Sequence, residues 1–167
     1  MTNAATDDVD QLRRALDDSF KNRAMLYWTI YQELRQELGA EKAEAILSRA
    51  IYARGKKVGD GAFSTFGAQD ARALGEAFLA ISPDGGRLFP TDVEPLANGV
   101  AFTVKRCPLK EAWQEAGLSD EDLSKLCRIA GRFDNGLFET SGVTVTTETW
   151  QPGVTGCCRI RLSNNPS

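Results

Sequence analysis

The amino-terminal fifth of the chain carries one apolar stripe that constrains much of the fold. Its apolar residues recur every three or four positions, as Leu12, Leu16, Phe20, Ala24, Tyr27, Tyr31, Leu34 and Leu38. That spacing places them on one face of an α-helix. Thr6 can cap the start of the helix, and Gly39 can end it in the left-handed conformation. The sequence therefore predicts a helix from Thr6 to about Leu38, long enough to serve as the interface of a homodimer.

Four further helices are expected, and they cover residues 43–51, 68–81, 108–117 and 119–133. The helix at 43–51 should stop at "ARGKKVGDG", because three glycines and two lysines indicate an exposed loop. The helix at 119–133 has the clearest start, since Ser119 can cap it and Asp122 lies three residues later.

Two antiparallel hairpins complete the predicted elements. Asn98-Gly99, a strong hairpin signal, lies between strands at 88–96 and 100–106, and Pro90 and Pro95 make the first of these an edge or irregular strand. Strands at 143–150 and 157–163 flank the turn "QPGVTG". This order predicts an α+β fold, with N-terminal helices packed on an antiparallel sheet built from two hairpins and a helix pair between them. We expect one domain over 1–167, ordered from about residue 6 to 163.

The composition argues against several classes of protein. A net charge of −3 supplies no basic surface, so no nucleic-acid partner is expected. The polar, acidic start of the chain lacks signal-peptide features, and no run of about 18 apolar residues follows. We therefore expect a cytoplasmic protein with no membrane partner, whose four cysteines are reduced thiols. The chain contains no histidine, which removes the commonest general base and metal ligand.

Cys107 lies between a predicted strand and a helix that Pro108 opens, at or next to the N-cap. The positive end of the helix dipole and the neighbouring Lys105 and Arg106 should all lower the pKa of its thiol. A lowered pKa is the requirement for a nucleophile. Alternatively, Cys107 is a weak cap that packs against the sheet.

Cys127 falls on the apolar stripe of its predicted helix, where core packing is the simplest explanation. Asp134 follows seven residues later, so it shares that face if the helix continues. A buried carboxylate there must be paired, capped or functional, although Asp134 is equally compatible with an exposed helix end.

Cys157 and Cys158 are adjacent on a strand and should point to opposite faces, so only one can join Cys107 in a site. Cys158 falls on the same face of the predicted strand as the apolar residues Ile160 and Leu162. This favours Cys158 as the thiol that points into the protein. Cys157 shares the other face with Arg159 and Arg161, which either bind a substrate carboxylate or form a solvated surface.

The cysteine spacing does not match a structural zinc site, and no phosphate-binding glycine loop is present. We expect no cofactor. A thiolate-bound metal remains conceivable, with Cys107, Cys127 and Cys158 as candidate ligands and Asp134 as a fourth.

Several stretches together resemble the L-2-amino-thiazoline-4-carboxylic acid hydrolase family. They are "FKNRAMLYWTIYQELRQELG", "AIYARGKKVG", "KRCPLKEAWQEAGLSDEDLSKLCRIAGRFDNGLFE" and "TETWQPGVTGCCRIRL". The resemblance covers most of the chain and implies hydrolytic opening of a small cyclic thiazoline acid to a carbamoyl-cysteine product, a step on a bacterial route to cysteine. On the matching positions it points to Cys107, Cys127, Asp134, Cys157 and Cys158.

These residues and the resemblance suggest one catalytic hypothesis. The Cys107 thiolate adds to C2 of the ring, a carboxylate such as Asp134 handles protons, and Arg159 or Arg161 holds the substrate carboxylate. Cys158 is the second thiol assigned to the site. In a variant of this scheme, a thiolate-bound metal activates the water.

A different class of function is a non-catalytic domain that binds a small molecule or senses thiol or metal chemistry. Aromatic residues are available to line a pocket, namely Tyr27, Trp28, Tyr31, Phe102 and Trp113, although ordinary core packing explains them equally well. Of these, we assign Tyr31 and Trp113 as substrate-binding candidates.

Overall fold

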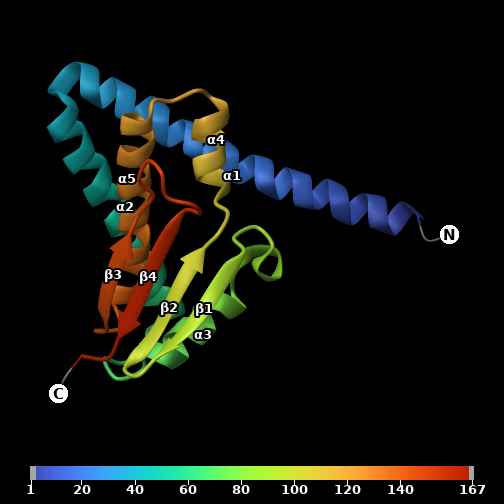
Figure 1. The fold of residues 1–167 in the computed structure, drawn as a ribbon, viewed down its shortest axis with the longest axis vertical. Coiled ribbons are helices and arrows are strands. Elements are labelled where there is room, and N and C mark those ends of the chain that lie inside the picture. The colour runs from blue at the N-terminus through green and yellow to red at the C-terminus, as the bar shows by residue number, and fades with distance from the viewer. Residues whose placement is uncertain (1–2, 166–167) are drawn as a thin grey trace.

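The computed structural model describes residues 3–165, with side chains described from residue 7 onward, and has two layers (Figure 1). In chain order the elements are α1 (Asn3–Leu38), α2 (Ala40–Ala62), α3 (Ala71–Ala80), the short 3₁₀ turn η1 (Pro83–Gly86), β1 (Thr91–Leu96), β2 (Gly99–Val104), α4 (Pro108–Glu115), α5 (Asp120–Glu139), β3 (Thr144–Glu148) and β4 (Cys158–Ser163). This order confirms the predicted α+β class. Residues 1, 2, 166 and 167 of the predicted single domain lie outside the described residues.

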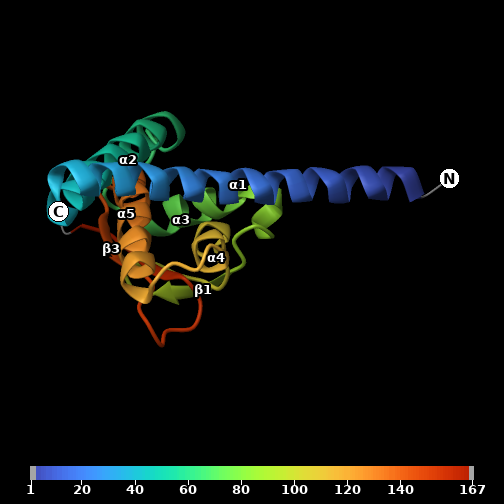
Figure 2. The same ribbon diagram turned by 90° about the horizontal axis from the view of Figure 1, so that it is seen from above.

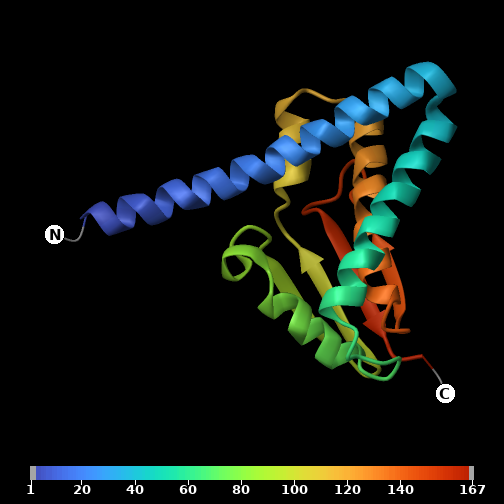
Figure 3. The ribbon, with the colours of Figure 1, turned by 180° about the vertical axis from the view of Figure 1, so that it is seen from behind.

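The two hairpins join in one antiparallel sheet with the order β1-β2-β4-β3. Strand β1, with its Pro95, is an edge strand as predicted. Seen from behind, α2, α3 and α5 cover one face of the sheet (Figure 3). The side chains of Ile160 and Leu162 point to that face and are buried, whereas Arg159 and Arg161 lie on the opposite face.

Helix α1 crosses the molecule on the side of α4 and α5, and its amino-terminal part extends beyond the rest of the protein (Figure 2). It begins at Asn3 rather than at the predicted Thr6, whose side chain lies outside the described residues. The inner face of α1 packs in a core cluster with α4 and α5, where the indole N–H of Trp113 donates a hydrogen bond to the Ala24 carbonyl at 2.8 Å. No helix in the described part of the chain combines the length and the apolar character needed to cross a bilayer.

The predicted loop at 53–61 is wrong, because α2 continues through it to Ala62. Two of its glycines are buried against α5. A Cβ atom at Gly55 would lie 2.1 Å from the Phe133 carbonyl oxygen, and one at Gly59 would lie 2.3 Å from the Leu137 carbonyl oxygen. On the facing helix, a Cβ at Gly136 would lie 2.2 Å from the Tyr52 carbonyl oxygen. The glycines therefore let the two helix backbones touch.

Helix α5 starts where predicted, since the Ser119 hydroxyl accepts a hydrogen bond from the Asp122 N–H at 3.2 Å. It runs six residues past the predicted end, to Glu139. Asp134 is therefore inside the helix, on the same face as Cys127.

Candidate functional site

Three of the four cysteines meet at the carboxyl end of strand β2. Cys107 is the N-cap residue of α4, immediately after β2. Cys158 opens β4 opposite Val104, and the Cys157 N–H donates a hydrogen bond to the Val104 carbonyl at 2.9 Å. The side chain of Cys157 is close enough to both of these thiols to raise the pKa of each. These contacts define the thiol cluster as Cys107, Cys157 and Cys158.

The expectation that only one of Cys157 and Cys158 could join Cys107 is wrong. Strand alternation applies from Cys158 onward, because Cys157 precedes β4. Gly156 before it has φ +87°, in the left-handed region that favours glycine. This turn places Cys157 beside the end of β2, where it reaches both neighbouring thiols.

The predicted lowering of the Cys107 pKa is also wrong. The pKa of this thiol is raised well above its usual value, first by the hydrogen bond with Cys157 and then by burial. Amides of the first turn of α4 act in the opposite direction without offsetting these effects. The two nearby cationic side chains, Lys105 and Arg106, form ion pairs with carboxylates. Lys105 pairs with Asp92 at 2.7 Å, and Arg106 pairs with Asp17 at 2.6 Å and with Glu111 at 2.7 Å.

The pKa of Cys158 is raised as well, by the hydrogen bond with Cys157, then by burial, and then by negative charge on Cys157, Asp134 and Cys107. Asp134 is thus electrostatically coupled to the thiol cluster from its position on α5. Burial raises the pKa of its carboxyl group to about 7 from the usual 3.8. At neutral pH this carboxyl group is therefore close to half-protonated.

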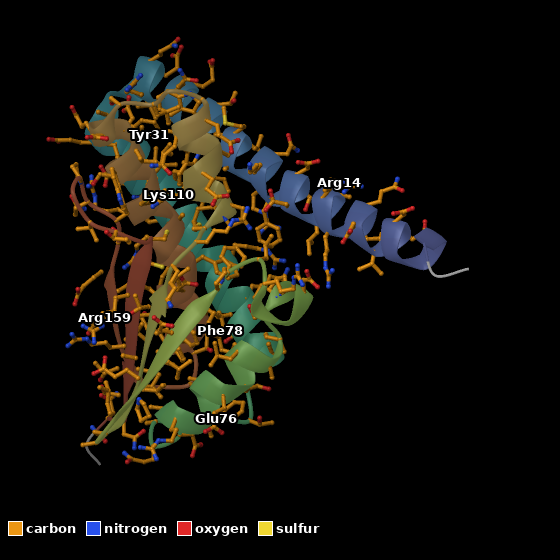
Figure 4. All side chains as sticks on the ribbon, turned by 45° about the vertical axis from the view of Figure 1, so that its right-hand side comes forward. Arg14, Tyr31, Glu76, Phe78, Lys110 and Arg159 are labelled. Carbon is orange, nitrogen blue, oxygen red and sulfur yellow. The ribbon has the colours of Figure 1, made fainter. Side chains whose placement is uncertain are left out.

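Beside the thiol cluster lies a groove of about 520 Å³, lined by Thr103, Glu148, Thr149, Gln151, Val154, Thr155, Cys157, Cys158 and Arg159. Figure 4 shows Arg159 on the side of the sheet away from α3. Its Nη2 group donates a hydrogen bond to Glu94, while its buried Nε–H has no partner among the described residues. An unsatisfied guanidinium N–H is suited to an anionic ligand.

Other predicted site residues do not line this groove. Asp134 and Cys107 are not among its lining residues, and Arg161 is exposed on the outer face of the sheet. Tyr31, Trp113 and Cys127 are buried in the core between α1, α4 and α5. In Figure 4, Tyr31, a residue of α1, is labelled among the helices above the sheet, whereas Arg159 is labelled beside the sheet. Within residues 3–165, no group of three or more Cys, Asp or Glu side chains is arranged to hold a metal ion.

One known protein family matches most of this chain. Residues 19–162 match the family model described as L-2-amino-thiazoline-4-carboxylic acid hydrolase. The chain belongs to this family. The match contains Asp134, Arg159 and all three residues of the thiol cluster, so the whole candidate site lies within the stretch that aligns with the L-2-amino-thiazoline-4-carboxylic acid hydrolase family. No curated protein matches the chain.

Two solved structures share the fold of this hydrolase family member. One is a trafficking protein particle complex subunit 3 from Naegleria fowleri, covalently bound to palmitic acid, with 15% identity and a TM-score of 0.58 over 87% of this chain and 95% of that one. The other is the phenol-responsive sensory domain of the transcription activator PoxR with phenol, with 13% identity and a TM-score of 0.51 over 84% of this chain and 73% of that one. At these identities the likeness concerns the fold alone.

Sequence reasoning missed the contribution of the β3–β4 connection to the groove. Gln151, Val154 and Thr155 come from a stretch that we interpreted only as a turn, and Thr149 comes from the end of the predicted strand at 143–150. The available signal was the pair Gly153 and Gly156, which adopt φ +85° and φ +87° and let the connection fold back over the sheet end. Trp150 supports this fold, since its indole N–H donates a hydrogen bond to the Val154 carbonyl at 3.0 Å.

Proposed function

We propose that the protein hydrolyses a small cyclic amidine acid, such as 2-aminothiazoline-4-carboxylate, with a cysteine thiolate as the nucleophile. The observation that carries this proposal is the presence of two thiols, Cys157 and Cys158, in one groove with the Arg159 side chain, whose Nε–H has no partner among the described residues. The family to which the chain belongs is named for this substrate. A thiolate is an effective nucleophile toward an electrophilic amidine carbon.

The reaction consumes one water per ring. A thiolate sulfur forms a bond to C2, and the ring nitrogen of the C2=N bond takes a proton. The ring C2–S bond then breaks, and the ring sulfur leaves as a thiol after taking a proton. Water adds to C2, the bond from C2 to the cysteine sulfur breaks, and the thiolate is restored. In the product, the oxygen of the water is bonded to C2. The two hydrogens that the water contributes to the balance are on the former ring nitrogen and the former ring sulfur.

Cys158 and Asp134 are suited to move these protons. The raised pKa of Cys158 keeps this groove-lining thiol protonated at neutral pH, so it can donate to the leaving ring atom. Asp134, with a pKa of about 7, can exchange protons with the cluster near neutral pH. Because Asp134 does not line the groove, it acts through Cys158 and not on the substrate.

Arg159 is proposed to bind the substrate carboxylate, and its replacement gives a direct prediction. In Arg159→Gln, the KM for the thiazoline acid should rise about 10- to 100-fold with a smaller change in kcat, because a charge-assisted contact to the ground state is lost. Arg161→Gln is the matched control, since Arg161 is exposed on the same strand and should change KM by less than about twofold. Equal effects from the two variants would contradict the assignment.

The function itself is tested by incubating the purified protein with 2-aminothiazoline-4-carboxylate and following carbamoyl-cysteine by mass spectrometry. Steady formation of the ring-opened product is expected. The same assay is run with a strong chelator, and turnover should persist. Loss of turnover on chelation would assign water activation to a thiolate-bound metal. Absence of turnover in both conditions would contradict the hydrolase proposal.

The alternative function is a domain that binds a small molecule without turning it over. In the two solved structures of this fold, the described ligands are palmitic acid and phenol. Recovery of an unchanged thiazoline acid bound to the protein, measured by calorimetry and mass spectrometry, would favour this alternative over hydrolysis.

A further inference from the structure

We propose that Glu148 binds the amidinium group of the substrate, so that the groove selects acids that also carry a cationic amidine. This inference rests on the hydrolase function proposed above and names a second binding residue in the same groove. Three observations support it: the pairing of β3 with β4, the charged residues that line the groove, and the ion pairs that these residues form.

Strand pairing places Glu148 beside Arg159. Glu148 is the last residue of β3, and it is the Cα partner of Arg159 in the antiparallel register of β3 with β4. Residues directly opposite each other project from the same face of a sheet, with their Cβ atoms roughly 5 Å apart. The alternation along β3 agrees, because Val145 packs on the core beneath the sheet whereas Thr146 and Glu148 are exposed. Both charged side chains therefore lie on the face of the sheet that the helices leave open.

The groove contains two charged residues of opposite sign. Its lining consists of Glu148 and Arg159 together with threonine, glutamine, valine and cysteine side chains. Glu148 and Arg159 are neighbours, yet Arg159 donates its hydrogen bond to Glu94 on β1. None of the ion pairs among the described side chains includes Glu148. The groove therefore offers a carboxylate that has no cationic partner from the described part of the chain.

These charges favour a ligand that is itself a zwitterion. Arg159 is already paired with the carboxylate of Glu94, and Glu148 is a second carboxylate next to it. A ligand with a carboxylate alone would add a third negative charge to this group. A ligand that also carries a cation can bind the free Nε–H of Arg159 with its carboxylate and Glu148 with its cation. The groove therefore discriminates by charge between a plain acid and an amidinium acid.

The thiazoline acid has the groups that this arrangement requires. Its carboxylate is on C4 and its amidine is centred on C2 of the same small ring, so two neighbouring side chains can contact both groups. The two nitrogens of a protonated amidine present parallel N–H donors, which match the two oxygens of a carboxylate. A carboxylate held against the amidine also favours its protonated form, in which C2 is more electrophilic. Glu148 is thus a substrate-binding residue that favours the reactive form of the ligand, and it forms no covalent bond.

Turnover of the thiazoline acid by Glu148→Gln provides the first test. This change keeps the size of the side chain and removes its charge. The KM should rise about 5- to 50-fold with a change in kcat of less than about threefold, because a charge-assisted contact to the bound substrate is lost. Glu76→Gln is the matched control, since Glu76 is an exposed glutamate on α3, well apart from Arg159 in Figure 4, and should change KM by less than about twofold. Equal effects of the two variants would overturn the assignment.

Binding of two unreactive acids, measured by calorimetry, provides the second test and needs no turnover. The first acid is 2-aminoimidazoline-4-carboxylate, a cyclic guanidine whose cation resists nucleophilic attack. The second is thiazole-4-carboxylate, which has the carboxylate and no amidine. Glu148→Gln should weaken binding of the guanidine acid about 5- to 50-fold. Its binding of the thiazole acid should stay the same or become tighter, because a negative charge is removed from the groove. Equal weakening of both acids would show that Glu148 acts through Arg159 or the fold, and would overturn the assignment.

The two proposals fail in different ways. If the wild-type protein opens the ring and Glu148→Gln leaves KM unchanged, the hydrolase function stands and the assignment of Glu148 is wrong. If the wild-type protein does not open the ring but Glu148→Gln weakens binding of the guanidine acid alone, the hydrolase function is wrong and Glu148 still binds the cation of an amidinium acid. If the ring stays closed and Glu148→Gln does not distinguish the two acids, both proposals are wrong.

Discussion

Replacing Gly136 with alanine is expected to destabilise the protein by about 3 kcal/mol, a large fraction of the unfolding free energy of about 5–15 kcal/mol that is typical of a domain. The new Cβ would lie 2.2 Å from the Tyr52 carbonyl oxygen and 2.8 Å from the Lys56 nitrogen. Both are backbone atoms of α2, so no side-chain rotation relieves the clash. Helices α2 and α5 would have to separate, and the free energy of unfolding measured in urea should fall accordingly.

Gly61 is the matched control for this experiment, because it lies in α2 and a Cβ added there would have nothing within 4 Å. Gly61→Ala should raise the free energy of unfolding by about 0.5–1 kcal/mol, since alanine is the better helix former. The two glycine-to-alanine changes should therefore have opposite signs. A destabilisation by Gly61→Ala as large as that by Gly136→Ala would show that helix contact is not the cause.

Replacing Asp134 with asparagine should change how stability depends on pH. The folded-state pKa of Asp134 is about 7, above the usual 3.8 that applies to the unfolded chain. As pH rises from about 4, the unfolded state therefore loses its proton first, and the folded state loses its proton only near pH 7. The favourable contribution of Asp134 is complete below about pH 4 and is lost as pH rises to about 7.

Asparagine does not titrate, so comparison of the two proteins isolates this effect. Between pH 3 and pH 8, the difference in unfolding free energy should move in favour of Asp134→Asn by up to about 4 kcal/mol. Urea denaturation at several pH values measures this difference. Asp18→Asn, at an exposed position on α1, is the control and should keep a nearly constant difference from the wild type. A constant difference for Asp134→Asn would contradict the burial of its carboxyl group.

The sequence predicted most elements of the fold because local signals and tertiary packing agree there. Ser119 caps α5 as expected, and the Asn98-Gly99 turn joins the paired strands β1 and β2. The end of α2 was wrong because Gly55 and Gly59, which usually mark a loop, are instead sites of backbone contact with α5. Glycines four residues apart are compatible both with a loop and with a close contact between two helices. Only the position of the facing helix distinguishes the two cases.

For the candidate site, the sequence predicted which residues lie near one another better than it predicted how their pKa values are shifted. Cys158 and Arg159 line one groove, and the charges of Cys107 and Asp134 act on Cys158. The pKa of Cys107 was predicted in the wrong direction, because Lys105 and Arg106 turn to carboxylates from β1, α1 and α4. Most of those partners are distant in sequence, so local sequence could not reveal them. The position of Cys157 depends on the left-handed turn at Gly156, which strand alternation does not predict.

The direct contact of the α2 and α5 backbones has a consequence for sequence variation. Helix α5 carries Asp134 to the thiol cluster, and its position is set by main-chain atoms rather than by side chains that can repack. In a saturation mutagenesis library selected for activity, Gly55, Gly59 and Gly136 should therefore tolerate as few replacements as the residues of the groove. In such a screen, these three glycines would be as intolerant of replacement as catalytic residues, although they do not contact the reacting groups.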